Sequence, residues 1–519
     1  MIYCTKCGTG NPNQAIYCIE DGHALHQSMQ TGLTKQTSDM VCHNCGSDQV
    51  SGAQYCYFCG ESFECVIHKV PERVKPKDHN IKMNDFKRPL LLAIPFALLC
   101  IVFLYVFSAF SLSLTDNHSY AEPFQHDMED FEQVQWGVSY RYLLDSYQMM
   151  KLEATEGAQQ MNWSPTVISA LSPVDIMLLG NLGEVYVTFD EVTNQKTSET
   201  LTNHTMESKL GLSFYLIITV ITIALAGMLY AFRVKVSDEK DWLIQTISFS
   251  FIYSIMMWVL SILTDYSMEK GYQTVNEVTN YSYQSWGVMW KSFLISFVVL
   301  LSVLSFKKGM KAQSVYAKGV KLASLAAVTI MSLYLILSGL IIGNVQEESF
   351  YQVLIGSSLI SGLVLIVQLS VYMLNLSFLN TFEMSGGDFN PEHFQYQILQ
   401  TVDSSLNNRL IQQGFVYLEN YLWMMLVITI LVILLYSLSF RKFTRKNQTK
   451  TILVYSGFIS LIFTGLTYAS NFSYSIVRAE FNEHYVIGFS LITLLLVSIF
   501  LSLITSLVGT KLMKISKKN

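Results

Sequence analysis

Eight long apolar segments restrict the fold of this chain more than any other feature. The first, residues 89–114, has no charged side chain and is long enough for a helix to cross a hydrocarbon core about 30 Å thick. Backbone groups inside a bilayer must be paired within their own segment, so such segments fold as helices. Because 51% of residues are hydrophobic and 14% are charged, we expect an all-α membrane bundle. The other seven segments are residues 210–232, 242–264, 286–306, 322–343, 421–440, 452–470 and 486–508.

A ninth apolar segment, residues 353–379, is rich in Gly, Ser, Gln and Asn. Such residues suit packing inside a bundle better than exposure to lipid. We therefore expect eight crossings plus one further membrane-embedded segment, which enters and returns or lies against the other helices. The alternative fold has nine helices. A single crossing here would then need a compensating one near residues 394–418, which Asp403 and Arg409 disfavour.

The distribution of Lys and Arg predicts the orientation of the spans, because cytoplasmic connections are enriched in these residues. Several Lys and Arg occur in the connection after residue 232, in residues 307–321, in residues 441–450 and in the tail, residues 511–519. One or none occurs in residues 265–285, 344–352, 380–420 and 471–485. We expect the first group and both termini in the cytoplasm, and the second group outside the plasma membrane. Residues 210–510 then form one polytopic domain.

A short motif raises the question of an internal repeat. Residues 304–306 and residues 438–440 both read Leu-Ser-Phe and both precede a basic connection, and Ala231-Phe232 is a weaker match. Repeats are common in transporters, but helical hairpins also resemble one another by chance. The motif leaves both interpretations open.

The N-terminal region contains two pairs of cysteine turns. In the second pair Cys42, Cys45, Cys56 and Cys59 form two C-x-x-C turns, separated by ten residues. Each turn presents two sulfur atoms to one ion, and Zn²⁺ prefers four tetrahedral thiolates. The glycine after each turn lets backbone N–H groups face the sulfur atoms. This spacing predicts one structural zinc site.

The first pair matches the second at Cys4, Cys7 and Cys18, but Asp21 stands where the fourth cysteine is expected. Asp21 is one candidate for the fourth ligand, and His23 is another, because both carboxylate and imidazole bind zinc. The third interpretation is a degenerate site without metal. A second zinc here is possible, with Asp21 as the preferred fourth ligand, and we expect it to bind more weakly than the zinc of the four-cysteine site.

The two pairs together resemble a duplicated zinc ribbon, with Tyr17 matching Tyr55 and Gly22 matching Gly60. The resemblance implies two small β ribbons, residues 1–28 and 38–65. Zinc ribbons of this kind often begin bacterial multi-pass membrane proteins, where a linker and membrane spans follow. The resemblance implies a fold and a metal, and it implies no activity.

The charge and redox chemistry of this head limit its partners. Residues 1–65 contain two Lys against six Asp and Glu, whereas nucleic-acid binding needs a basic face. Zinc thiolates need a reducing compartment, so we expect a cytosolic head that contacts a protein. Residues 66–88 carry seven Lys and Arg and read as a basic linker to the first span.

Residues 115–209 form an acidic segment between the first two spans, with fifteen Asp and Glu against four Lys and Arg. Alternation over residues 184–192 predicts a strand. We expect a small folded external region. A divalent cation, a cationic peptide or a basic polymer would suit its charge, and its ligand is not identified.

The sequence contains no HExxH, GxSxG or GxxxxGK motif, and we expect no enzyme. No span carries a central carboxylate, and Lys291 lies near a helix end, where its amine can extend to the interface. The leading hypothesis is a sensor, scaffold or assembly factor that acts through protein contacts. The alternative is a permease or channel with a regulatory zinc head, and a membrane-tethered nucleic-acid binder is a weaker third.

Overall fold

The computed structural model describes two units, residues 1–80 and residues 81–519. Cys42, Cys45, most of the basic linker and residues 114–171 of the acidic segment lie outside the described residues. Described are residues 2–25 except 5, 8 and 14, 40–41, 48–49, 55–60 except 57, 85–113, 172–193, 202–209, 213–236, 238–272, 275–307, 315–344, 359–386, 392–397, 403–404, 409–442, 445–477 and 482–515.

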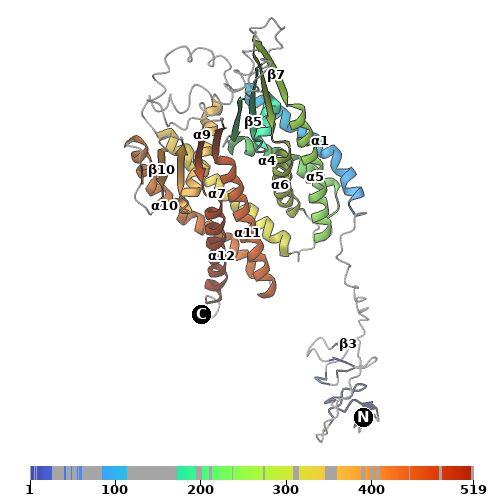
Figure 1. Ribbon diagram of the computed structural model, residues 1–519. Helices are drawn as coiled ribbons and strands as arrows, with labels where there is room; N and C mark the ends of the chain where they lie inside the picture. Colours follow the sequence, from blue (N-terminus) through green and yellow to red (C-terminus); the bar gives the residue numbers. More distant parts are fainter. Residues whose placement is uncertain are drawn as a thin grey trace. The chain divides into compact units, whose positions relative to one another are not determined.

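In the described part of the second unit, eight helices are long and apolar enough to cross a membrane, and each overlaps one of the eight predicted segments (Figure 1). Their packing leaves large apolar side chains exposed around the bundle, where lipid would lie. They are α1 (Lys87–Ser113), α4 (Ser213–Arg233), α5 (Glu239–Leu263), α6 (Ser285–Ser305), α7 (Val315–Asn344), α10 (Arg409–Ser437), α11 (Arg445–Ser470) and α12 (Leu491–Ile515).

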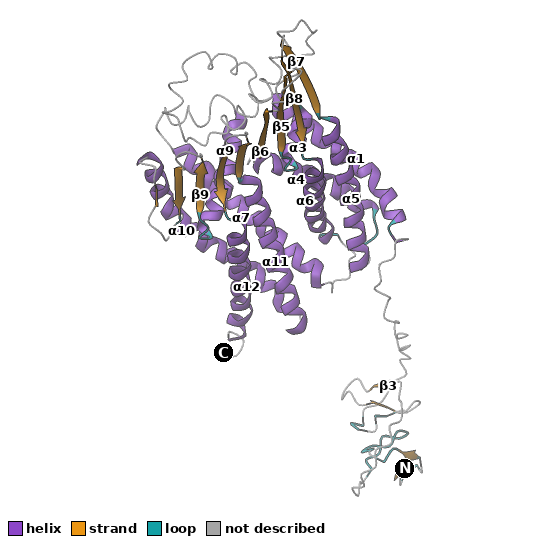
Figure 2. Ribbon diagram, in the orientation of Figure 1, coloured by secondary structure: helices purple, strands orange, loops and turns teal. Residues whose placement is uncertain are grey.

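The connections between these helices build a nine-stranded antiparallel sheet (Figure 2). The predicted strand at residues 184–192 is confirmed as β5, but the sheet as a whole is not part of the predicted all-α fold. Its order is β11-β10-β9-β13-β12-β6-β5-β8-β7. The strands are β5 (Val185–Thr193), β6 (Thr202–Lys209), β7 (Tyr266–Tyr272), β8 (Val275–Tyr283), β9 (Phe382–Gly386), β10 (Glu392–Tyr396), β11 (Asp403–Ser404), β12 (Phe472–Val477) and β13 (Asn482–Phe489).

The N-terminal end of α1 and the C-terminal end of α12 both lie on the side of the bundle opposite this sheet. Asp85, just before α1, pairs with Lys240 at the start of α5 (2.6 Å), and α5 ends next to β7. Near the end of the chain, Gly509 in α12 lies against Ser437 at the end of α10. Because one sheet joins all the strands, the strand-bearing connections share one side of the bundle. They include residues 265–285, 380–420 and 471–485, which are poor in Lys and Arg.

Helix α9 (Leu359–Ser377) holds the ninth apolar segment, and it lies across the sheet-side ends of its neighbours. Gln368 Nε2 donates to the Ser470 carbonyl at the end of α11 (2.8 Å), and Ser213 Oγ at the start of α4 donates to Gln368 Oε1 (3.1 Å). The chain then turns directly into β9. The described residues of 394–418 belong to the end of β10, to β11 and to the start of α10, and they form no separate helix.

The second unit consists of two halves with the same order of elements. The first contains α1, α3 (Pro173–Gly180), β5, β6, α4, α5, β7, β8 and α6, and the second contains α7, α9, β9, β10, α10, α11, β12, β13 and α12. The second half has one additional short strand, β11, between β10 and α10. Strand order is also the same, β6-β5-β8-β7 and β10-β9-β13-β12. Even the register agrees, since Val185 pairs with Tyr283 and Phe382 pairs with Phe489. We conclude that the membrane region is a duplication.

Local backbone details repeat in the same way. Leu182 after α3 (φ 61°) and Leu379 after α9 (φ 59°) are the two non-glycine residues with positive φ in the described part of the chain. In both copies the next N–H closes a Schellman turn, Gly183 to the Leu178 carbonyl (2.9 Å) and Asn380 to the Asn375 carbonyl (3.1 Å). Positive φ is uncommon for leucine, so the same turn at equivalent helix ends supports a common origin of the two halves.

The Leu-Ser-Phe motif does not mark this duplication. Residues 304–306 end α6 and residues 438–440 follow α10, but α6 corresponds to α12 in the element order. The equivalents of α6 residues lie 206 positions later, in α12, the same separation as between Tyr283 and Phe489. The shared motif reflects a common requirement instead, because both segments end an apolar helix just before a basic connection.

Small residues at duplicated positions explain how the helices of each half approach closely. Ser250 and Ser254 of α5 recur as Ser456 and Ser460 of α11, and all four are buried. In α6 and α12, Ser296 and Ser502 each donate to the carbonyls three and four residues earlier. Spacing of this kind lets helix backbones pack tightly without a hydrophobic driving force.

The described end of the acidic segment belongs to the bundle rather than to a separate external region. Helix α3 begins with a capping box between Ser172 and Asp175, and Asp175 is 2% exposed. Tyr283 at the end of β8 donates to Asp175 Oδ1 (2.9 Å). Burial of this carboxylate is compatible with folding because both of its oxygens accept hydrogen bonds.

Candidate metal centre

The first unit contains two short antiparallel hairpins. Strands β1 (Ile2–Tyr3) and β2 (Gly10–Asn11) flank the first turn, and β3 (Met40–Val41) and β4 (Asp48–Gln49) flank its counterpart. A hairpin holds two cysteines at its tip, so a second turn from later in the chain completes the ligand set.

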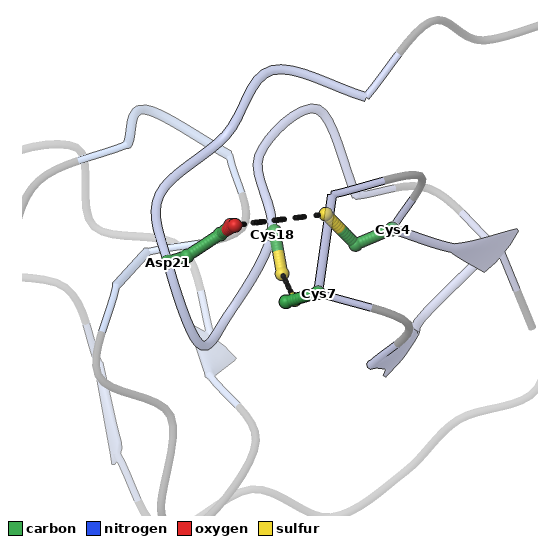
Figure 3. Close-up of side chains that lie close together, drawn as sticks. All are labelled: Cys4, Cys7, Cys18 and Asp21. Atoms are coloured by element: carbon green, nitrogen blue, oxygen red, sulfur yellow. Dashed lines mark hydrogen bonds between the residues drawn. The ribbon is translucent and has the colours of Figure 1, made fainter.

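The first hairpin brings together Cys4, Cys7, Cys18 and Asp21, whose ligand atoms all lie within 4.8 Å of one another. Cys7 Sγ lies 3.5 Å from Cys18 Sγ, and Cys4 Sγ lies 3.8 Å from Asp21 Oδ1 (Figure 3). Cys4 and Cys18 are buried, whereas Cys7 is exposed. Three sulfur atoms and one carboxylate in this arrangement could hold a metal ion.

Asp21, rather than His23, faces the three sulfur atoms. The His23 backbone N–H donates to Asp21 Oδ1 (3.0 Å), which orients the carboxylate and lowers the pKa of the Asp21 carboxyl group. The imidazole of His23 is not part of the ligand group, and His23 is exposed. Of the two candidate side chains for the fourth ligand, the geometry favours Asp21.

The local environment shifts the pKa values of the Cys18 and Cys7 thiols in opposite directions. Burial raises the pKa of the Cys18 thiol to about 11, whereas hydrogen bonding to Thr9 lowers the pKa of the Cys7 thiol. Metals bind thiolates, so an ion at this site must displace the Cys18 proton. A backbone N–H group also stabilises a thiolate at this site, since the Lys6 N–H donates to Cys4 Sγ (3.4 Å).

Two of the four predicted ligands of the second site are described, Cys56, which is buried, and Cys59. The N–H groups of Phe58 and Cys59 both donate to Cys56 Sγ (3.4 and 3.5 Å). This is the turn geometry that a thiolate ligand needs. Cys42 and Cys45 stay a prediction, because they lie outside the described residues.

The matched Tyr and Gly residues of the two ribbons have a shared role in packing. Tyr55 covers Gly22 and, reciprocally, Tyr17 covers Gly60. A Cβ atom at either glycine would lie 3.0 or 3.1 Å from the ring, and both glycines have positive φ (66° and 77°). The ribbons therefore pack as a symmetric pair, which spacing alone does not predict.

We expect Gly60→Ala to destabilise this pair by about 1–2 kcal/mol, because it places a side chain in left-handed backbone and against Tyr17. The midpoint of urea-induced metal release from the full chain would measure the loss. Glu20→Ala, at an exposed position of the same unit, is the control. Equal midpoints for Gly60→Ala and the wild type would contradict the packing role.

We also expect Asp21→Ala to weaken metal binding at the first site, and His23→Ala to leave it unchanged. Metal counting by native mass spectrometry during a chelator titration measures both. Loss of metal from His23→Ala alone would reverse the assignment of the fourth ligand.

One ion pair in the second unit is not predicted by the sequence. Lys291, near the start of α6, pairs with Glu184 at a distance of 2.7 Å. No local pattern signals this contact, because Glu184 precedes β5 and Lys291 belongs to α6. The pair exists only once the strands and helices of the first half have assembled.

Comparison of the chain with protein-family models, with curated proteins and with solved structures finds no match. The functional proposals below therefore depend on the geometry and chemistry of this chain.

Proposed function

We propose that the protein is a membrane-spanning scaffold or sensor that connects an external partner to a cytosolic protein through a zinc-binding head. The observation that carries this proposal is the nine-stranded sheet, which joins every strand-bearing connection into one continuous surface. A sheet built from both halves holds the bundle as one body and presents edge strands for pairing with another chain.

The orientation rests on charge. The connections opposite the sheet carry most of the Lys and Arg between spans. This charge distribution favours an orientation with these connections and both termini in the cytoplasm and the sheet outside the plasma membrane. A cytosolic head is consistent with thiolate ligands, which need a reducing compartment.

The metal is zinc in this proposal. Three or four thiolates on hairpin turns form the ligand set of structural zinc sites, and such sites stabilise small domains that lack a large core. The second site uses Cys42, Cys45, Cys56 and Cys59, and the first uses Cys4, Cys7, Cys18 and Asp21. With its excess of acidic residues, the head would bind a protein rather than a nucleic acid. The proposal includes no enzymatic activity.

Chemical crosslinking in intact cells, followed by purification of the full chain, tests the scaffold. We expect a cytosolic protein to crosslink to the wild type and to be lost with Cys56→Ser, while Cys100→Ser, a buried position in α1, retains it. Capture by both variants to the same extent would contradict a role for the ribbons.

A permease is the second candidate, and the duplication favours it, because many transporters consist of two related halves. Reconstitution into proteoliposomes separates the candidates. Solute flux that persists without the head would support the permease, and the scaffold requires no flux.

A further inference from the structure

The two halves of the bundle meet at a buried charged cluster. Strand β6 of the first half pairs with β12 of the second, with Lys209 opposite Ser473. Three charged side chains of the first half lie at this junction together with one tyrosine of the second half. We call Glu184, Lys209, Lys291 and Tyr468 the junction cluster.

Two members of the junction cluster contact the same carboxylate oxygen, Oε1 of Glu184. Lys291 Nζ lies 2.7 Å from Glu184 Oε1, and the Tyr468 hydroxyl donates to the same oxygen (2.9 Å). Lys209 Nζ lies over the Tyr468 ring, 3.3 Å from its centroid, and Lys291 Nζ lies 5.6 Å from that centroid. Both amines therefore lie close to one aromatic ring.

The cluster contains more positive than negative charge. Lys209 has no carboxylate within ion-pair distance in the described part of the chain, and the nearby Glu207 is exposed and accepts a hydrogen bond from Tyr186. Burial lowers the pKa of Lys209 to about 8, although Glu184 opposes this shift. Lys209 keeps some solvent access, whereas the Lys291 amine is fully shielded.

The second half shows that the fold does not require these charges. The shared registers place Thr381 at the position of Glu184, and Gln397 at the position of Lys209. The equivalent of Lys291 is Val497. The same architecture thus forms with three neutral side chains. Because buried charge is costly, its presence in one copy alone points to a ligand.

We propose that the junction cluster binds a single anionic oxygen group, a phosphate or a carboxylate. Lys209 contacts the anion directly from its accessible position, and Lys291 adds positive potential from behind, held in place by Glu184. Ammonium groups at such sites bind phosphate as point charges. The anion is a soluble ion or the headgroup of a lipid. This site goes beyond the proposed scaffold function, and neither proposal depends on the other.

Two binding measurements on the purified full chain distinguish the sources. Calorimetric titration with inorganic phosphate probes a soluble ligand. Native mass spectrometry after exchange into phosphatidylcholine nanodiscs, with or without phosphatidylglycerol, probes a lipid. We expect binding in at least one arm, and about 10- to 100-fold weaker binding for Lys209→Gln, which loses a charged hydrogen-bond donor.

Each variant introduces the residue that stands at the equivalent position of the second half. Lys209→Gln reproduces Gln397, and Glu184→Thr reproduces Thr381. Glu184→Thr removes a competing carboxylate, so we expect it to bind the anion more tightly, a gain that misfolding cannot mimic. Lys235→Gln, at an exposed position opposite the sheet, should match the wild type. Absence of binding in both arms, or unchanged binding by Lys209→Gln, would overturn the proposal.

Discussion

Replacing Cys56 and Cys59 together by serine is expected to unfold the second ribbon. Cys56 is buried and accepts two backbone N–H groups, so its loss removes both a metal ligand and the centre of the turn. Structural zinc contributes about 10–16 kcal/mol of binding free energy in small zinc domains. We expect the protein to lose the tighter zinc ion, measured by native mass spectrometry, and the head to become sensitive to protease.

The first ribbon should be affected as well, because Tyr55 covers Gly22 and Tyr17 covers Gly60. Cys100→Ser is the control, since this cysteine is buried in α1 and outside the head. A double variant that retains its full zinc content and protease resistance would contradict the assignment of these cysteines as ligands.

The second large effect is expected from Asn471→Leu, at the start of β12. Asn471 Nδ2 donates to the Phe489 carbonyl (2.8 Å), and its Oδ1 accepts from the Phe489 N–H (3.0 Å). Removing both bonds leaves the N–H and carbonyl groups of Phe489 in β13 without these partners. Each unpaired group lowers the free energy of unfolding by about 1–3 kcal/mol. We expect a lower midpoint of thermal unfolding in detergent.

The first half provides a matched comparison. Asp265 is the equivalent of Asn471, and its Oδ1 accepts from the Tyr283 N–H (3.2 Å). Asp265→Asn keeps this acceptor, so we expect a much smaller change in the unfolding midpoint. The proposed role of this contact is wrong if Asn471→Leu melts at the same temperature as Asp265→Asn.

The spans could be predicted because hydropathy alone identifies them, and bilayer thickness determines their length. The sheet could not, because its strands are short and pair with partners far away in sequence. Residues 486–489 illustrate the limit. They are apolar and read as the start of the last span, but they form part of β13, between β9 and β12.

The group of Cys4, Cys7, Cys18 and Asp21 could be predicted because its spacing in the sequence is local. In contrast, the junction cluster combines Glu184, Lys209, Lys291 and Tyr468, which come together only when the first half has assembled and β6 has paired with β12. The duplication is equally hidden. Equivalent positions often differ in residue type, as Lys291 and Val497 do, and the matching evidence is backbone geometry and register.

The central claim is that the sheet lies outside the membrane and both chain ends lie inside. Labelling single introduced cysteines in intact cells with a membrane-impermeant maleimide tests it most directly. Glu383→Cys and His484→Cys, at exposed sheet positions, should react in intact cells. Lys235→Cys and Ser439→Cys, on the opposite side, should react only after permeabilisation. The reverse pattern, or a different response at Glu383 and His484, would contradict this orientation.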